Sequence, residues 1–171
     1  FTFINTPAAA YDVYLSSSTT AAAGFIYPND SWGTTAYEPN DWDFTFPDVI
    51  TLYIVPEVGS VFGASDIIIE WDNTMFSYVG VDKTGGIYAN ASSQFFVTQA
   101  GNQVTINAGR FDNTNVTITG GQYIAKLNLN LIKSGFGPVN FTALDFRAFD
   151  GLGGQFGVFV TGSNAQVKSY L

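Results

Sequence analysis

The chain has 171 residues, a net charge of −8 at pH 7, and neither histidine nor cysteine. The missing residue types exclude a Ser-His-Asp triad, a thiol nucleophile, a disulfide and a Cys-based zinc site. The six basic residues are scattered and no 18-residue apolar run occurs, so we expect no nucleic-acid partner and no membrane span.

The first 46 residues are predicted to be an extension of the domain that follows. Two segments of this extension alternate like strands, and their apolar residues are Phe1, Phe3 and Ile4, and then Tyr11, Val13 and Leu15. An extended segment outside a folded core can add a strand to the edge of another sheet. These six residues are therefore predicted as donor-strand residues at a subunit interface.

A loop with aromatic and acidic residues completes this extension. Its aromatic residues are Tyr27, Trp32, Tyr37 and Trp42, which form either a platform for stacking sugars or a cover over the sheet. Asp41 and Asp43 project to one side of an extended segment, as oxygen ligands of calcium do. Solvated carboxylates are the alternative to a calcium site, and no other cofactor is expected.

Residues 47–171 consist of short strand patterns separated by turns. The run from Val49 to Val55 is apolar on both faces, as expected of a buried strand. A second strand is predicted over residues 67–71 and a third over 76–81, with a turn at residues 72–73 between them. Hairpins are predicted at Gly101-Asn102, between strands 95–98 and 104–108, and at Gly120-Gly121, between strands 115–119 and 122–132.

The strand over residues 122–132 has the clearest alternation. Leu127, Leu129 and Leu131 share one face, and Asn128 and Asn130 share the other. Successive side chains of a strand point to opposite faces, so the leucine row faces a core. Further strands are predicted at 139–141, 146–149, 156–160 and 165–170, with turns at Gly135 and residues 151–154. The fold class is therefore all-β, an antiparallel two-sheet sandwich or jelly roll.

Several of these segments resemble the cohesin family of secreted sandwich modules. They are the buried strand 49–55, the hydrophobic strand and turn 67–76, the alternating strand 124–129 and the acidic-glycine turn 149–151. Asn73 stands where the family favours proline, and residues 1–46 have no counterpart. The resemblance implies a jelly-roll sandwich with a binding or assembly role, and no dockerin-contact residue is carried over.

The polar positions carry Thr, Asn, Ser and Gln, and only 12% of the residues are charged, against about 25% in an average protein. Neutral faces suit burial against another subunit or under glycans, although an ordinary secreted β-domain also has them. We predict a non-enzymatic, extracellular or cell-surface protein that assembles with itself into a filament by strand donation. The alternative is a cohesin-like recognition module for a dockerin-type protein or a polysaccharide.

Carboxylates and asparagines supply the remaining candidate sites. Asp66 and Glu70 are considered as a pair for glycosidic cleavage, against the simpler explanation of solvated carboxylates at strand ends. The two arginines, Arg110 and Arg147, are expected to anchor loops by pairing with carboxylates. Glycosylation sequons, Asn-x-Ser/Thr, begin at Asn29, Asn90, Asn115 and Asn140.

Overall fold

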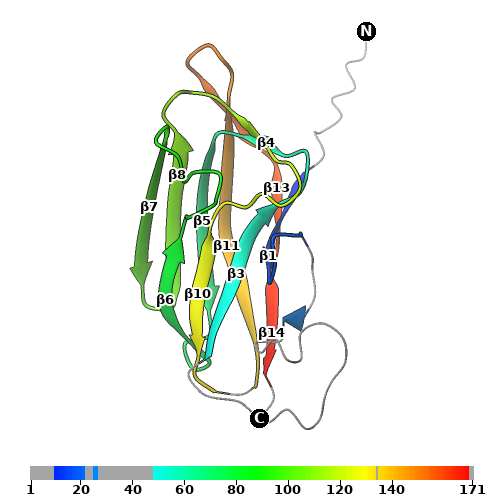
Figure 1. Cartoon of the computed structure of the whole chain (residues 1–171), viewed down its shortest axis with the longest axis vertical. Coiled ribbons are helices and arrows are strands. Elements are labelled where there is room, and N and C mark those ends of the chain that lie inside the picture. The colour runs from blue at the N-terminus through cyan, green and yellow to red at the C-terminus, as the bar shows by residue number, and fades with distance from the viewer. Residues whose placement is uncertain (1–9, 22–24, 27–47, 134, 170–171) are drawn as a thin grey trace.

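The computed structural model describes residues 10–21, 25–26, 48–133 and 135–169. These residues form fourteen β-strands and no helix. The strands build two large sheets that face each other, with a small two-stranded sheet beside them (Figure 1). Within the described residues, no helix has the length and apolar character needed to cross a membrane. The predicted all-β sandwich is confirmed.

The first sheet, sheet A, has five strands in the order β13-β1-β3-β10-β6. Their bounds are β1 (Tyr11–Ser16), β3 (Asp48–Pro56), β6 (Phe76–Asp82), β10 (Lys126–Leu131) and β13 (Val160–Ser163). All neighbours pair antiparallel except β1 and β13, which run parallel.

The second sheet, sheet B, follows the order β2-β14-β11-β5-β8-β7, and β12 pairs with β11 beside this path. Its strands are β2 (Phe25–Ile26), β5 (Ala64–Trp71), β7 (Ser93–Ala100), β8 (Gln103–Arg110), β11 (Gly135–Phe149), β12 (Gln155–Val158) and β14 (Ala165–Ser169). The small sheet joins β4 (Val61–Phe62) to β9 (Val116–Thr117). Strand β7 forms one end of the sheet B path, at the left margin of Figure 1.

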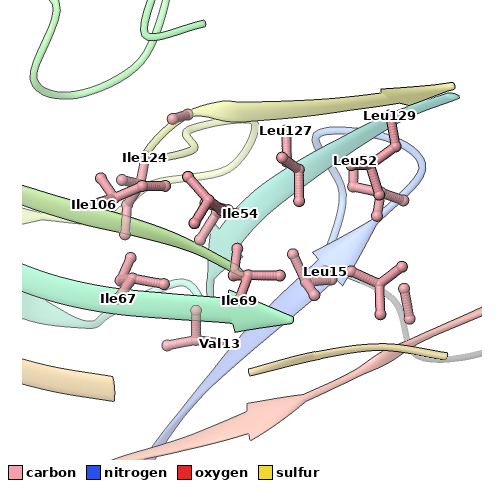
Figure 2. Packing of buried hydrophobic residues seen from close by; sticks show 14 of the residues in the cluster. Val13, Leu15, Leu52, Ile54, Ile67, Ile69, Ile106, Ile124, Leu127 and Leu129 are labelled. Carbon is pink, nitrogen blue, oxygen red and sulfur yellow. The ribbon is translucent and has the colours of Figure 1, made fainter. Parts of the chain in front are cut away.

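The core lies between the two sheets and is built from alternate residues of their strands. Leu127 and Leu129 of β10 are fully buried and lie across from Ile67 and Ile69 of β5 and Ile106 of β8 (Figure 2). The leucine row that the sequence predicted to face inward does so, because β10 lies inside sheet A with a neighbour on either side. Full burial of one such side chain contributes about 2 kcal/mol to folding.

Strand β1 corrects the prediction that the whole of residues 1–46 lies outside the sandwich. It pairs antiparallel with β3 and parallel with β13, and Val13 and Leu15 are buried in the same core as the leucine row (Figure 2). Tyr11, Val13 and Leu15 therefore complete the chain's own sheet and do not fill a neighbour's groove. The physical reason is entropic, since closing a loop within one chain costs less than ordering two chains in a complex.

Other predicted features of the first 46 residues lie outside the described residues. These are the donor candidates Phe1, Phe3 and Ile4, the aromatic loop, the calcium candidates Asp41 and Asp43, and the sequon at Asn29. They stay predictions.

One predicted hairpin is confirmed and the other is wrong. Gly101 and Asn102 form the two-residue turn between β7 and β8, with Ala100 opposite Gln103. The residues around Gly120-Gly121 do not pair across that turn, because β9 pairs instead with β4. The backbone of Ile118, just after β9, also forms hydrogen bonds with Gly59 and Ser60, just before β4.

Strand β11 also differs from the prediction, which had separate strands on either side of residue 142 and a turn at Gly135. It is one strand of fifteen residues that begins at Gly135. Its pairing with β5 shifts between Phe141 and Ala143. A bulge inserts one unpaired residue without ending the strand, so the alternation in the sequence changes phase while the strand continues.

Candidate functional site

The candidate site is the solvent-facing side of β11, β5, β8 and β7, which we call the outer face of sheet B. In each of these strands one set of alternate residues enters the core, so the other set forms this face. The register aligns the outward residues in rows across the strands. Its main residues are Asp66, Ile68, Glu70, Phe96, Thr98, Gln103, Thr105, Asn107, Asn140, Ala143, Asp145 and Arg147.

A charged row crosses this face around Asp66. Arg147 Nη2 donates to Asp66 Oδ2 at 2.7 Å, and Asn107 Nδ2 donates to Asp66 Oδ1 at 2.8 Å. Arg147 Nη1 also donates to Gln155 Oε1 at 3.3 Å, so the chain of contacts joins β12, β11, β5 and β8. These bonds hold the polar groups in fixed positions, which lowers the entropy cost of recognising a partner.

Asp145 carries the exposed charge of the same row. It lies directly opposite Asp66 in the β11–β5 pair, and among the described residues no hydrogen bond or ion pair reaches its carboxylate. Two carboxylates that face each other across a strand pair repel. A cationic group that binds beside Asp145 relieves this repulsion, so this position favours a basic side chain.

A neutral row separates the charged row from a second polar row. It consists of Ala143, Ile68, Thr105 and Thr98. In the second polar row, Gln103 Nε2 donates to Glu70 Oε2 at 2.7 Å. The outer face of sheet B is therefore a strip of small and neutral side chains between two polar rows, with three carboxylates against one arginine.

A shallow depression of about 270 Å³ lies at the end of this face, where β5 and β11 meet the β7–β8 turn. Its lining includes Glu70, Asp72, Asn102 and Asn140. Hydrogen bonds from the Thr74 hydroxyl and backbone N–H lower the pKa of Asp72, so this carboxylate closes its own turn. Within the described part of the chain, no group of three or more His, Cys, Asp or Glu residues could hold a metal ion.

The structure does not bring Asp66 and Glu70 together as a hydrolytic pair. They lie four residues apart on one face of β5, which corresponds to about 13 Å along a strand. The carboxyl groups of glycosidases lie roughly 5 to 9.5 Å apart. Each of the two is instead bonded to an amide of β8, at Asn107 and Gln103.

The described sequons differ in how their asparagine side chains are used. The Asn115 amide is bound on both sides by the backbone of Phe149, at 2.9 and 2.8 Å. The Asn90 amide closes a turn by accepting from Ser92 N and Ser93 Oγ. Asn140 lines the depression and has no side-chain hydrogen bond within the described residues. Glycosylation stays a prediction, and Asn140 is the described sequon whose amide is free.

Both arginines pair with carboxylates, as predicted, but only Arg110 does so at a loop, since Arg147 joins two neighbouring strands, β11 and β5. Arg110 pairs with Asp112 at 3.0 Å and Arg147 with Asp66 at 2.7 Å. The roles of Asn107 and Asp145 were not predicted from the sequence, because the row in which they lie joins residues up to 81 positions apart in the chain. The signal that could have found it is register, since outward polar residues of neighbouring strands must meet once the inward residues are assigned.

The outer face of sheet A differs in chemistry. Its charged pair is Lys126 with Asp82, at 3.3 Å. Beside it, the Thr51 hydroxyl donates to Asn128 Oδ1 at 2.7 Å. The outer face of sheet A also has an acidic position at Asp12 of β1, whose carboxylate accepts a hydrogen bond from the Tyr14 hydroxyl at 3.3 Å. What this face lacks, among the described residues, is a row of bonded polar side chains with an unbonded carboxylate beside it, as at Asp66 and Asp145 on sheet B.

Comparison with solved structures supports the fold, whereas comparison of sequences finds no match. No protein-family model matches the chain. No curated protein matches it either. Among solved structures, similar ones include the non-cellulosomal cohesin of Archaeoglobus fulgidus, with 13% identity, a TM-score of 0.64, and 95% of this chain and 93% of that chain covered.

Two further structures extend the comparison. The sixth cohesin of scaffoldin B from Acetivibrio cellulolyticus, solved in complex with a dockerin, has 13% identity and a TM-score of 0.65, and 95% of this chain and 100% of that chain are covered. A cohesin module from a Clostridium perfringens family 33 glycoside hydrolase has 10% identity and a TM-score of 0.57, over 94% of this chain and 98% of that one. Each of the three structures covers at least 94% of this chain, which is more than residues 48–171 alone make up.

Proposed function

The chain has a cohesin-like fold, and from this premise we propose that it is a non-enzymatic recognition module that binds a dockerin-type protein. The binding surface in this proposal is the outer face of sheet B. The observation that carries it is the ordered row at Asp66 with the exposed, unpaired carboxylate of Asp145 beside it. Two of the similar cohesins were solved in complexes with dockerins, which supports the class of partner.

The chemistry of the face defines what the partner must offer. The neutral strip through Ile68 and Thr105 suits the uncharged centre of an interface, where charged residues are depleted. The carboxylates on either side attract a basic rim, which raises the association rate more than the final affinity. A partner with Lys or Arg positioned near Asp145 fits both requirements.

The test is titration calorimetry of the chain against a panel of purified dockerin modules. Asp145→Lys is expected to weaken binding about tenfold, mostly through slower association and with less effect at high salt. Glu57→Lys makes the same charge change just after β3, outside the face, and is expected to retain binding. Equal affinities of the two variants, or a panel in which no module binds, would contradict the proposal.

An extracellular or cell-surface location belongs to the same proposal. The low content of charged residues and the many Thr and Asn side chains support it. Fractionation of the source cells tests it, and recovery of the protein from the cytoplasm alone would contradict it.

Self-assembly into a filament by strand donation is the second candidate. It is favoured by the open edge of sheet B at β7, and its donor is now limited to Phe1, Phe3 and Ile4, because β1 is used within the chain. Deletion of residues 1–9 should then abolish fibres seen by electron microscopy. Fibres that persist after the deletion, or their absence in the intact protein, would remove this candidate.

A further inference from the structure

Strand β7 is an edge strand without the usual protection against pairing. It has eight residues, Ser93–Ala100, with no charge, no proline and no glycine. Its pairing with β8 runs unbroken, and no described strand pairs with its other side. Natural edge strands are normally shortened, bulged or charged, because an unpaired row of N–H and C=O groups attracts another strand.

The other sheet ends among the described strands are protected. β2 has two residues, and β12 and β13 have four each. β6 is long, but its pairing with β10 contains a bulge and its last residue, Asp82, is charged. The open edge at β7 is therefore a particular property of this strand.

The hairpin turn fixes which backbone groups of β7 are free. Ala100 and Gln103 flank a two-residue turn in which Gly101 has φ 59°, as the first central residue of a type II′ turn does. The closing pair of such a turn exchanges both hydrogen bonds, so the even-numbered residues of β7 bond to β8. The N–H and C=O groups of Phe95, Val97 and Gln99 point to the open side.

The side chains of β7 make the edge complementary to itself. Phe96 is 61% exposed and Val97 is 37% exposed, and they lie at the middle of the strand. The ends carry the neutral polar residues Gln94 and Gln99. A two-fold axis places the residue on the axis next to the same residue of the other copy. Two identical charged side chains repel each other there, whereas two identical apolar side chains pack favourably.

We propose that β7 pairs antiparallel with β7 of a second copy of this chain, around a two-fold axis at Val97. Val97 then faces the second copy's Val97, and Phe96 faces the second copy's Thr98. This register satisfies the free N–H and C=O groups on both chains. It also suits a protein of net charge −8, since two copies approach most easily through an uncharged edge.

The pairing has a structural consequence. A two-fold axis perpendicular to the sheet keeps both outer faces on the same side, so the two sheets B join into one continuous sheet. The dimer presents two copies of the outer face of sheet B side by side. The inference does not depend on the proposed partner, because it rests on the edge and not on the face.

The experiment is sedimentation equilibrium of the full chain over a range of concentrations, with each variant checked for cooperative unfolding. The wild-type protein should form a dimer, and Val97→Lys should weaken it about tenfold or more, because two lysines would face each other. Val79→Lys is the matched control, since Val79 is a similarly exposed valine (48%) on the edge strand β6, and it should retain the dimer.

A charge-swap mixture tests the register itself. Val97→Lys mixed with Val97→Asp should restore a dimer, because the axis sets residue 97 of one copy opposite residue 97 of the other. A wild-type protein that stays monomeric up to about 1 mM would overturn the proposal. Equal loss in the two lysine variants, no recovery in the mixture, or a dimer that disappears on deletion of residues 1–9 would also overturn it.

Discussion

Removing the side chain of Leu15 measures directly whether β1 is part of the chain's own sandwich. Leu15 is 2% exposed and belongs to the buried core with Val13 and Leu52. Truncation of a buried leucine to alanine costs the lost transfer free energy and leaves a cavity, together about 3 kcal/mol. The same change in a solvated arm costs less than about 0.5 kcal/mol.

Urea denaturation of Leu15→Ala provides the assay, with Ser17→Ala as the control. Ser17 is exposed one residue after β1 ends, so its loss should leave the free energy of unfolding within about 0.5 kcal/mol of wild type. For a domain of this size, 3 kcal/mol also lowers the melting temperature by roughly 6 to 12 °C. The midpoint should not change with protein concentration, since the contact is within one chain.

The reasoning fails if Leu15→Ala unfolds at the wild-type urea concentration. The reasoning also fails if Leu15→Ala is less stable than the wild type only above a threshold protein concentration. The second result would mean that β1 is exchanged between copies.

Three further predictions concern buried and turn-closing polar groups. Tyr88→Phe leaves the buried Ser65 hydroxyl without its 2.8 Å partner, so unfolding should become easier by about 1 to 3 kcal/mol, and adding Ser65→Ala should recover part of that loss in thermal melts. Asn115→Ala removes both hydrogen bonds to the backbone at the end of β11; we expect a loss of about 1 to 2 kcal/mol in urea titrations, and an unchanged midpoint would refute the bracing role. The Arg110 guanidinium beside Asp112 lowers the pKa of that carboxyl, so its stabilisation is complete above the unfolded-state pKa near 4 and declines as the pH falls below it. Urea denaturation followed by circular dichroism should therefore find the wild type more stable than Asp112→Asn at pH 7, with a difference that shrinks as the pH is lowered below about 4. A difference that is absent at pH 7, or that grows on acidification, would contradict this reasoning.

The strands with strict alternation could be predicted from the sequence. In β10 the leucines at 127, 129 and 131 are buried and the asparagines between them are not, because each central strand has one core face. The turn at Gly101-Asn102 was also predictable, since its two residues suit a hairpin and the strands on both sides alternate. These features depend on residues close together in the chain.

Features that depend on long-range pairing could not be predicted. The alternation of Val13 and Leu15 identifies a strand but does not say which sheet it joins, so its place beside β3 was missed. In the same way, Val116 pairs with Phe62 and not across the nearby glycine turn. The row that joins Asp145, Asp66 and Asn107 depends on the register of three strands, which a single sequence does not fix.

The central claim is that a dockerin-type protein binds to the outer face of sheet B. Its most direct test is an NMR titration, in which a dockerin-type protein that binds is added stepwise to the isotope-labelled chain. Binding through the outer face of sheet B should shift the side-chain amide signals of Asn107 and Gln103 and leave that of Asn128, on the outer face of sheet A, in place. The opposite pattern, with Asn128 shifted and the two sheet B amides unchanged, would contradict the proposed binding face.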